Sequence, residues 1–314
     1  MRPGVSNATL RRVAGILDPR TIRRLRRGLL GWYAADHRDF PWRGTRDPYH
    51  VLVSEVMLQQ TQASRVAERF PRFIERFPTV ESLASAAPAT VLAEWSGLGY
   101  NRRALALQRA AASVALGGWP RDVAGLRRLP GIGPYTARAV ASLAFDLPVG
   151  VVDTNVRRWI LRRLGGPDDP RRLQSISDAL AAPGRGILVA AWTHATMEFG
   201  AAVCRARDPR CDACPIAAAC PSRGTPVTVA VARQPRLRGS DRAYRGAVLR
   251  ILSSAEGHRR DARRLRADLA RDDRRIGPVL AEDAWERILD GLERDGLAHR
   301  SGGSVQLGAA TIGA

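Results

Sequence analysis

Residues 129–137 form the stretch that most constrains the fold of this chain. They read Leu-Pro-Gly-Ile-Gly-Pro-Tyr-Thr-Ala, and an apolar, helix-compatible segment follows to residue 145. Gly131 and Gly133 permit backbone angles that other residues resist, and Pro134 is tolerated in the first turn of a helix. The stretch predicts two helices joined by a tight hairpin, with bare N–H groups that bind an anion such as a DNA phosphate. A plain Pro-Gly loop between core helices is the alternative.

The charge of the chain indicates a polyanionic partner. The net charge is +20 over 314 residues, a length typical of about two domains. Fourteen arginines against twelve acidic residues in 241–314 leave +18 for the first 240 residues, and residues 1–30 alone hold eight arginines and one aspartate. There is no lysine, so all 50 cations are arginines. A side-chain amine that could form a Schiff base is therefore excluded.

Hydrophobic patterning predicts a chain made almost entirely of helices. A basic amphipathic helix is expected over 20–35, and a long helix is expected from Pro48 to about Arg69. Residues 222–240 have the composition of a linker. Helices near 242–253, 262–270 and 282–294, followed by a β-like pair around 301–303, favour a small winged-helix-like domain over 241–314.

No membrane segment is expected. The sequence has no run of about 18 apolar residues, and its N-terminus lacks the apolar region of a secretory signal. We therefore expect a protein located in the cytoplasm, associated with the nucleoid in a bacterium. We also expect it to be a monomer.

All four cysteines fall within 17 residues, with the spacing C-x6-C-x2-C-x5-C. Four thiolates converging from one loop are typical of a metal site, and a [4Fe-4S] cluster needs thiolates spread around a large core. Structural zinc more often uses two C-x2-C pairs, of which only one is present. We expect an iron–sulfur cluster, with zinc and unligated thiols as alternatives. The predicted ligands are Cys204, Cys211, Cys214 and Cys220.

Two carboxylates are candidates for acid–base chemistry. Glu55 has apolar neighbours in its helix, and partial burial there would raise its pKa so that it donates a proton near neutral pH. A solvated glutamate is the alternative. Asp153 precedes a helix, where an N-cap is the simplest role and the helix dipole favours the ionised form. One raised acid and one persistent carboxylate are what glycosidic cleavage requires.

These motifs together resemble one family. The hairpin, Asp153 and the cysteine loop are similar to the endonuclease III superfamily of DNA glycosylases. Within it, SEVMLQQTQ (54–62) and GLGY (97–100) resemble the MutY-type adenine glycosylases. The resemblance covers roughly 25–221. It implies an all-α fold of two lobes, a six-helix barrel over 46–150 with the helix–hairpin–helix, and a cluster lobe made of 1–45 and 151–221.

The resemblance also implies a role for each residue of the active site. The glutamate matching Glu55 protonates adenine at N7, and the aspartate matching Asp153 stabilises the oxocarbenium ion before water attacks. Tyr135 occupies the position of the nucleophilic lysine in strand-nicking relatives, which supports a monofunctional hydrolase. Asn155 matches an asparagine that helps to position the aspartate and water.

Other matching residues imply contacts to DNA. Residues matching Gln60 and Tyr100 wedge into the base stack while adenine is flipped out. Residues matching Trp42, Arg43 and Leu58 form walls of the adenine pocket.

The chain also departs from the family pattern. Thr154 replaces a glycine, Asn101 replaces a second tyrosine, and His194 stands where Glu or Gln is common. His194 is either a pocket residue or a satisfied core histidine. Relatives that find 8-oxoguanine carry a Nudix-like domain with a Phe-Ser-His reader, and we expect this chain to lack that domain and its reader, since no phenylalanine follows Phe199.

The sequence therefore predicts a base excision repair enzyme. The expected substrate is double-stranded DNA containing adenine mispaired with 8-oxoguanine or guanine. A thymine or uracil mismatch glycosylase on the same scaffold and a non-catalytic iron–sulfur DNA-binding protein are the alternatives.

Overall fold

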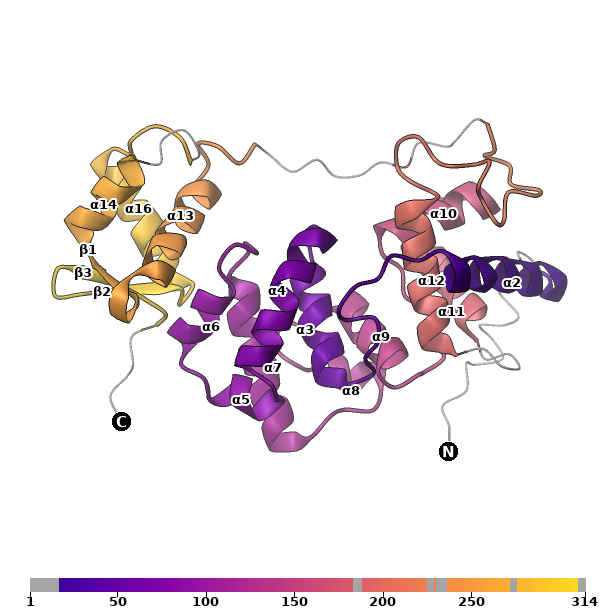
Figure 1. Cartoon of the computed structure of the whole chain (residues 1–314), viewed down its shortest axis with the longest axis horizontal. Helices are drawn as coiled ribbons and strands as arrows, with labels where there is room; N and C mark the ends of the chain where they lie inside the picture. Colours follow the sequence, from indigo (N-terminus) through magenta and orange to yellow (C-terminus); the bar gives the residue numbers. More distant parts are fainter. Residues whose placement is uncertain (1–16, 183–187, 225–228, 230–235, 272–275, 310–314) are drawn as a thin grey trace. The chain divides into compact units, whose positions relative to one another are not determined.

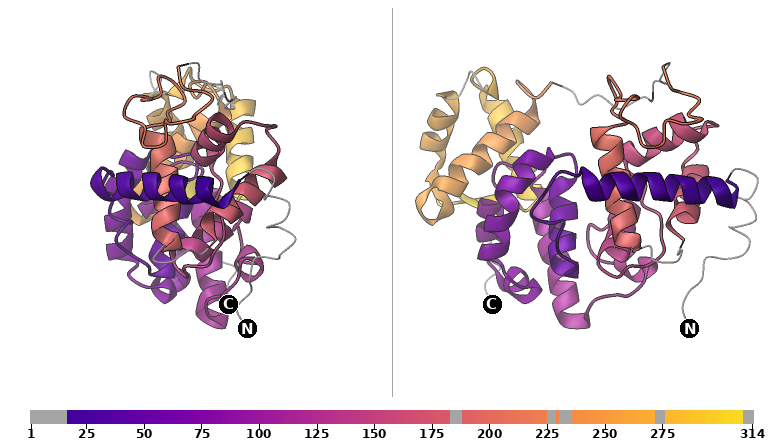
Figure 2. Two further views of the ribbon diagram at one scale, coloured as in Figure 1. Left: turned by 90° about the vertical axis from the view of Figure 1, so that its right-hand side faces the viewer. Right: turned by 45° about the vertical axis from the view of Figure 1, so that its right-hand side comes forward.

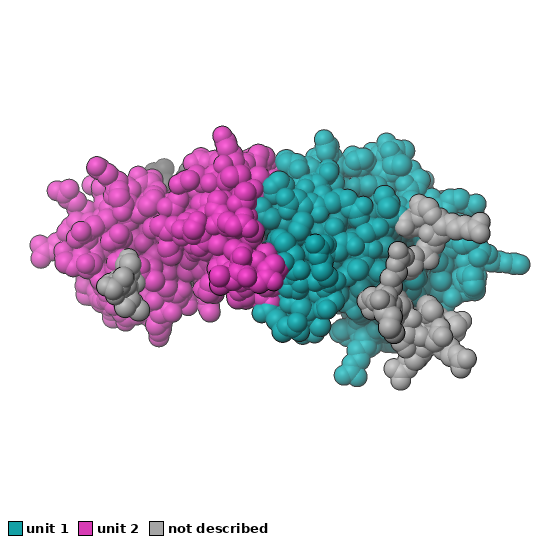
Figure 3. Space-filling view, turned by 90° about the horizontal axis from the view of Figure 1, so that it is seen from below, with its two compact units in different colours: residues 1–55, 119–128, 132–232 teal, residues 56–118, 129–131, 233–314 magenta. Residues whose placement is uncertain are grey.

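The computed structural model describes residues 17–182, 188–224, 229, 236–271 and 276–309, and it divides the chain into two compact units (Figures 1 and 3). Unit 1 comprises 1–55, 119–128 and 132–232, and unit 2 comprises 56–118, 129–131 and 233–314. The basic segment 1–16 and most of the expected linker lie outside the described residues. The lobe boundaries implied by the resemblance stay a prediction.

Unit 1 is helical. It contains the start of α3 and the helices α2 (Pro19–Ala35), α8 (Val123–Arg127), α9 (Pro134–Leu143), α10 (Thr154–Leu164), α11 (Pro170–Ala181) and α12 (Val189–Ala202). The expected amphipathic helix at 20–35 is confirmed as α2, which begins after the N-cap Asp18. Leu25 and Leu29, one turn apart, are fully buried in a core that also holds Trp159 and Phe199. Figure 2 shows α2 lying across α12.

The helix–hairpin–helix is confirmed. Asp122 caps α8 by accepting a hydrogen bond from Gly125 N at 2.6 Å, and α9 begins at Pro134 as the motif predicts. Gly131 has φ +73°, and a Cβ there would lie 2.6 Å from Ala106 Cβ. Both the backbone angle and the close approach therefore require glycine at this position.

Unit 2 begins with the end of α3 (Pro48–Leu58), followed by α4 (Ala63–Arg76), α5 (Val80–Ser85), α6 (Pro88–Glu94) and α7 (Arg102–Gly117). The single long helix expected from Pro48 to Arg69 is wrong, because α3 ends at Leu58 and the backbone turns through Gln60 at φ +55°. Helical periodicity continues across this turn in the sequence, so it could not reveal the break.

The C-terminal part of unit 2 has the expected winged-helix-like architecture. Its elements are α13 (Asp241–Ser254), the short 3-10 helix η1 (Glu256–His258), β1 (Arg259–Asp261), α14 (Ala262–Ala270), α16 (Glu282–Arg294), β2 (Ala298–Ser301) and β3 (Ser304–Leu307). The sheet is antiparallel with the order β1-β3-β2, and Gly302 and Gly303 turn the chain between β2 and β3. The polar three-residue strand β1 was not expected, because its Arg-Arg-Asp sequence gives no strand signal.

This C-terminal domain packs on the rest of unit 2 through α13 and β3, which both contact α6. Among the helices that the structure describes, none combines the length and the apolar character needed to cross a bilayer.

Candidate active site

Glu55 is buried in the middle of α3, with 5% of its surface exposed. Its helix neighbours Leu52, Val56 and Met57 are also buried. The Oε2 atom of Glu55 has no hydrogen-bond partner among the described residues. Burial raises the pKa of Glu55 to about 7, because the charged form loses its hydration. The alternative of a solvated glutamate is wrong.

Tyr135 and Asp153 both affect the charge state of Glu55, although Asp153 is 98 positions away in the sequence. The Tyr135 hydroxyl lies 4.0 Å from Met197 Sδ on α12. It acts to lower the pKa of Glu55 and so partly opposes the effect of burial. The negative charge of Asp153 adds to the increase in the pKa of Glu55. Burial together with the two carboxylates raises the pKa of the Tyr135 phenol well above its ordinary value, so the phenol stays protonated.

Asp153 caps the N-terminus of α10, as the simplest interpretation of the sequence predicts. Its Oδ1 accepts a hydrogen bond from Val156 N at 2.6 Å, and its Oδ2 accepts one from Asn155 Nδ2 at 2.8 Å. Burial raises the pKa of Asp153, and these hydrogen bonds with the nearby Arg158 oppose the increase. The site therefore contains two different carboxyl groups. Glu55 receives no hydrogen bond on Oε2 from the described residues, whereas both oxygens of Asp153 accept hydrogen bonds.

Arg158 supports this arrangement from behind. Its Nη2 donates to Asn155 Oδ1 at 2.8 Å, which orients the amide so that its NH2 group faces Asp153. Gly200 of α12 approaches Asn155 so closely that a Cβ would lie 2.7 Å from Asn155 Cβ. Thr154, the departure from the family glycine, is exposed at the first position of α10.

Trp42 and Arg43 lie in a partly buried aromatic and charged cluster of unit 1. Trp42 stacks on Phe40 at 4.8 Å between ring centroids. Arg43 donates to the Tyr33 hydroxyl at 3.0 Å and pairs with Glu198, which is 2% exposed. Because Glu198 also accepts from Arg38 at 2.5 Å, the guanidinium of Arg43 has a fixed orientation.

His194 joins the same cluster and is neutral near pH 7. Its ring lies parallel to Tyr33, with the centroids 6.5 Å apart. Burial and the charge of Arg43 lower the pKa of His194 to about 4. His194 and Glu198 are one turn apart on α12, so the helix presents both to this cluster.

Leu58, Gln60 and Tyr100 lie in unit 2. Leu58 is half-buried in the last turn of α3, whereas Gln60 and Tyr100 have left-handed backbones, with φ of +55° and +49°. Arg103 holds both turns by donating hydrogen bonds to the carbonyls of Val56 at 2.6 Å, Gln59 at 2.5 Å and Gly99 at 3.1 Å. Strained backbone of this kind persists only where the surroundings impose it, and it is frequent at ligand-binding sites.

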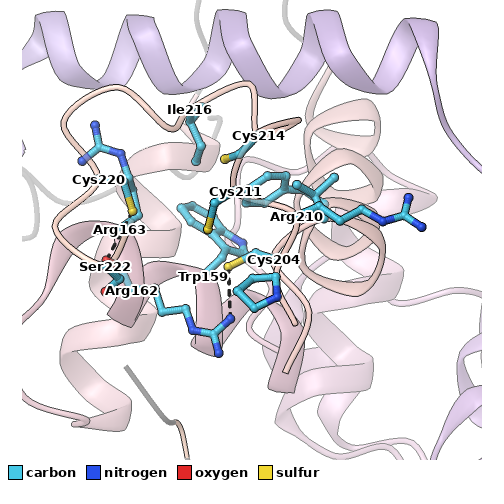
Figure 4. Close-up of a pocket in the computed structure, with 13 residues that line it drawn as sticks. Trp159, Arg162, Arg163, Cys204, Arg210, Cys211, Cys214, Ile216, Cys220 and Ser222 are labelled. Atoms are coloured by element: carbon cyan, nitrogen blue, oxygen red, sulfur yellow. Dashed lines mark hydrogen bonds between the residues drawn. The ribbon is translucent and has the colours of Figure 1, made fainter. Parts of the chain in front are cut away.

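The four cysteines line one cavity in unit 1, together with Trp159, Phe199 and Ile216 (Figure 4). In the described part of the chain, no three His, Cys, Asp or Glu side chains come together in the manner needed to hold a single metal ion. Burial raises the pKa of Cys214 to about 11.

Three buried arginines of α10 hold the cysteine loop. Arg158 donates to Cys204 O at 2.8 Å, Arg162 donates to Arg205 O at 2.6 Å, and Arg163 donates to Ala218 O at 3.3 Å. Arg162 Nη1 also lies 3.7 Å from Cys204 Sγ. The loop has no regular secondary structure between 204 and 220, so these bonds fix its path.

Comparisons with known proteins agree with this geometry. Residues 53–182 match the family model of the HhH-GPD superfamily base excision DNA repair protein. The adenine DNA glycosylase of Mycolicibacterium smegmatis is 40% identical over 272 residues, which cover 84% of this chain and 93% of that protein.

The chain belongs to the adenine DNA glycosylase family.

Other relatives of this glycosylase show which part is shared more widely. The adenine DNA glycosylase of Rattus norvegicus is 41% identical over 221 residues, which cover 65% of this chain but 42% of the rat protein. A solved structure of a thermostable thymine-DNA glycosylase is 31% identical, with a TM-score of 0.59. The match covers 64% of this chain and 95% of the chain in that structure. The structure of a trapped endonuclease III–DNA covalent intermediate is 25% identical, with a TM-score of 0.55. The match covers 65% of this chain and 96% of the chain in that structure.

Family membership makes the chain a DNA-binding enzyme of base excision repair, a glycosylase that hydrolyses N-glycosidic bonds. The sequence predicted Glu55, Tyr135 and Asp153, but it did not predict the residues that hold the predicted site residues in position. The missed residues are Tyr33, Arg38, Arg158, Met197 and Glu198. Glu198 did leave a signal, because it is a lone acid in an otherwise apolar helix.

Proposed function

We propose that this glycosylase releases adenine mispaired with 8-oxoguanine or guanine in double-stranded DNA, and that it does so as a monofunctional hydrolase. The observation that carries the proposal is the buried Glu55 carboxyl, whose pKa of about 7 lies at the operating pH of a general acid. The 40% identity to a mycobacterial adenine DNA glycosylase supports adenine as the base. The opposite base rests on the resemblance alone.

Glu55 is the proposed acid. Protonated Glu55 gives its proton to N7 of the extruded adenine, which becomes a neutral leaving group as its bond to the sugar breaks. The Tyr135 hydroxyl, which favours the charged form of Glu55, is proposed to hold the carboxyl in place during the transfer. Arg43, fixed by Glu198 and Tyr33, forms a wall of the base pocket with Trp42.

Asp153 is the proposed stabiliser of the sugar cation. Its carboxylate lies near Glu55 and is kept in position by Asn155 and Val156 N. Negative charge there stabilises the oxocarbenium ion until water attacks the anomeric carbon. Because the chain has no lysine, the sugar is not captured as a side-chain Schiff base, and the DNA strand remains intact.

The cysteine loop is the proposed site of one [4Fe-4S] cluster. The donor set fits, because four thiols surround one cavity and the arginines Arg162 and Arg163 also line it. Bound there, the cluster would cross-link the loop between Cys204 and Cys220 and thereby stabilise it. Arg158 and Arg162 hold the carbonyls of the same loop.

Two alternatives remain as outcomes of the test. A thymine or uracil mismatch glycosylase is related by fold, as the 31% identity to a thymine-DNA glycosylase shows. A non-catalytic iron–sulfur protein would have no use for a buried, partner-poor carboxylate next to Tyr135 and Asp153. A monomer in the cytoplasm or nucleoid is part of the proposal.

The decisive experiment is single-turnover base release from duplexes with 8-oxoG:A, G:A, G:T and G:U pairs. We expect release of adenine only, with strand cleavage appearing only after alkali. Glu55→Gln should slow release by roughly 10²- to 10⁴-fold, the usual contribution of a general acid. Glu68→Gln, at an exposed position of α4, serves as the matched control and should keep the wild-type rate. Release of thymine or uracil without adenine would contradict the proposal.

A further inference from the structure

A groove of about 830 Å³ lies within unit 2 between α13 and the two strained turns. The Gln59–Gln60 and Gly97–Tyr100 turns form one wall, and α13 of the C-terminal domain forms the other. The packing of α13 on α6 holds the two walls together. The groove is large enough for part of a nucleic-acid strand, since pockets for drug-sized ligands span roughly 300–1,000 Å³.

The lining of this groove is strongly positive. The described lining residues include no aspartate or glutamate. They include six arginines, which are Arg65, Arg102, Arg103, Arg242, Arg245 and Arg250. Asp295, behind the lining, pairs with Arg102 at 3.5 Å and with Arg245, so it offsets one of these charges. A lining with six arginines and no described acid favours a polyanionic occupant.

Tyr100 connects the two walls. Arg242 of α13 donates to the Tyr100 hydroxyl at 3.0 Å, and its guanidinium lies 5.9 Å from the ring centroid. Arg103 lies 5.4 Å from the same centroid. The ring is 36% exposed, so Tyr100 and the two guanidinium groups over its ring together form part of the groove surface.

The other face of the C-terminal domain does not suit DNA. The helix α16 carries exposed Glu282, Asp283, Glu286 and Asp290. Arg300 of β2 is occupied by ion pairs to the acids of this helix, including Glu286 at 2.7 Å. Acidic side chains repel a duplex, so α16 is poorly suited to reading the major groove, although Arg266 and Arg300 offset part of its charge.

We propose that the groove between α13 and the Gln60 and Tyr100 turns binds the phosphodiester backbone of a DNA strand. The C-terminal domain then extends the DNA-binding surface through Arg242 and Arg250 of α13, while α16 faces away from the nucleic acid. The choice of DNA as the polyanion rests on the proposed function.

Gly246 provides a test that leaves the arginines intact. It is exposed on the groove-facing side of α13, and a Cβ there would meet no described atom within 4 Å. Gly246→Glu introduces a negative charge into the groove, and Gly246→Gln introduces nearly the same shape without charge. Both replacements favour the helix relative to glycine, so both variants are expected to fold.

The measurement is fluorescence anisotropy of the full-length protein with a labelled undamaged duplex at several salt concentrations. Gly246→Glu should bind about tenfold more weakly than Gly246→Gln at 0.1 M salt, because of repulsion between neighbouring charges. For Gly246→Glu, the slope of log affinity against log salt concentration should be smaller in magnitude by about 1, which corresponds to the loss of one phosphate contact. Arg264→Ala, at an exposed position of α14 outside the groove, should change neither quantity.

The proposal would be overturned if the two Gly246 variants had equal DNA affinities and salt slopes, whether both bound like the wild type or both bound more weakly. Adenine release from the 8-oxoG:A duplex separates this result from a failure of the proposed function. If the Glu variant binds more weakly while no duplex releases adenine from the wild type, the groove proposal stands and the substrate proposal falls.

Discussion

The buried Glu55 carboxyl should make the stability of this protein depend on pH. The folded state binds a proton at Glu55 up to about pH 7, whereas the unfolded state releases it near 4.5. Between these values the folded state holds more protons, so the free energy of unfolding falls as pH rises. The full loss amounts to about 3 kcal/mol by linkage, and it is complete above pH 8. Glu55→Gln has the same shape and does not titrate, so it should remove this loss.

Urea unfolding at pH 5 and pH 8.5 measures the effect. The wild type should lose about 3 kcal/mol more than Glu55→Gln between the two pH values. Other titrating groups, including His194, contribute equally to both proteins and cancel in the comparison. Glu68→Gln, at an exposed position, should follow the wild type. The same pH dependence in wild type and Glu55→Gln would refute the conclusion that burial holds Glu55 protonated.

Three further predictions concern the supporting residues. Glu198→Gln leaves the two arginines that it binds without a carboxylate, so urea unfolding should show a loss of about 3 kcal/mol. Asn155→Ala removes one donor to Asp153, and single-turnover adenine release should slow by about 10- to 100-fold without a change in DNA affinity. Gly131→Ala forces a left-handed alanine against Ala106, so unfolding should cost at least about 1–2 kcal/mol less, and a wild-type midpoint would contradict the close approach.

The local elements of this fold were readable from the sequence because their signals are local. Glycine and proline spacing predicted the hairpin at Gly131, and three helices with a glycine turn predicted the winged-helix-like domain. The cysteine spacing predicted one loop, and all four thiols do line one cavity. The convergence of Glu55 and Asp153 depended on the family resemblance, because no sequence pattern relates positions so far apart.

The supporting network could not be predicted, because it depends on long-range packing. Arg43 and Glu198 are 155 positions apart, and no sequence pattern indicates that these two residues form an ion pair. The break after Leu58 was also hidden. It depends on hydrogen bonds from Arg103 to the carbonyls at the end of α3, and helical periodicity does not register such contacts.

The pH dependence of adenine release tests the central claim most directly, because the proposed acid must be protonated to act. We predict that the single-turnover rate on an 8-oxoG:A duplex is constant while Glu55 is protonated and Asp153 is ionised, and that it is half-maximal near pH 7. Above pH 8 it should fall about tenfold for each further pH unit. A rate that stays constant from pH 6 to pH 9, with DNA binding unchanged, would contradict the assignment of Glu55 as the proton donor.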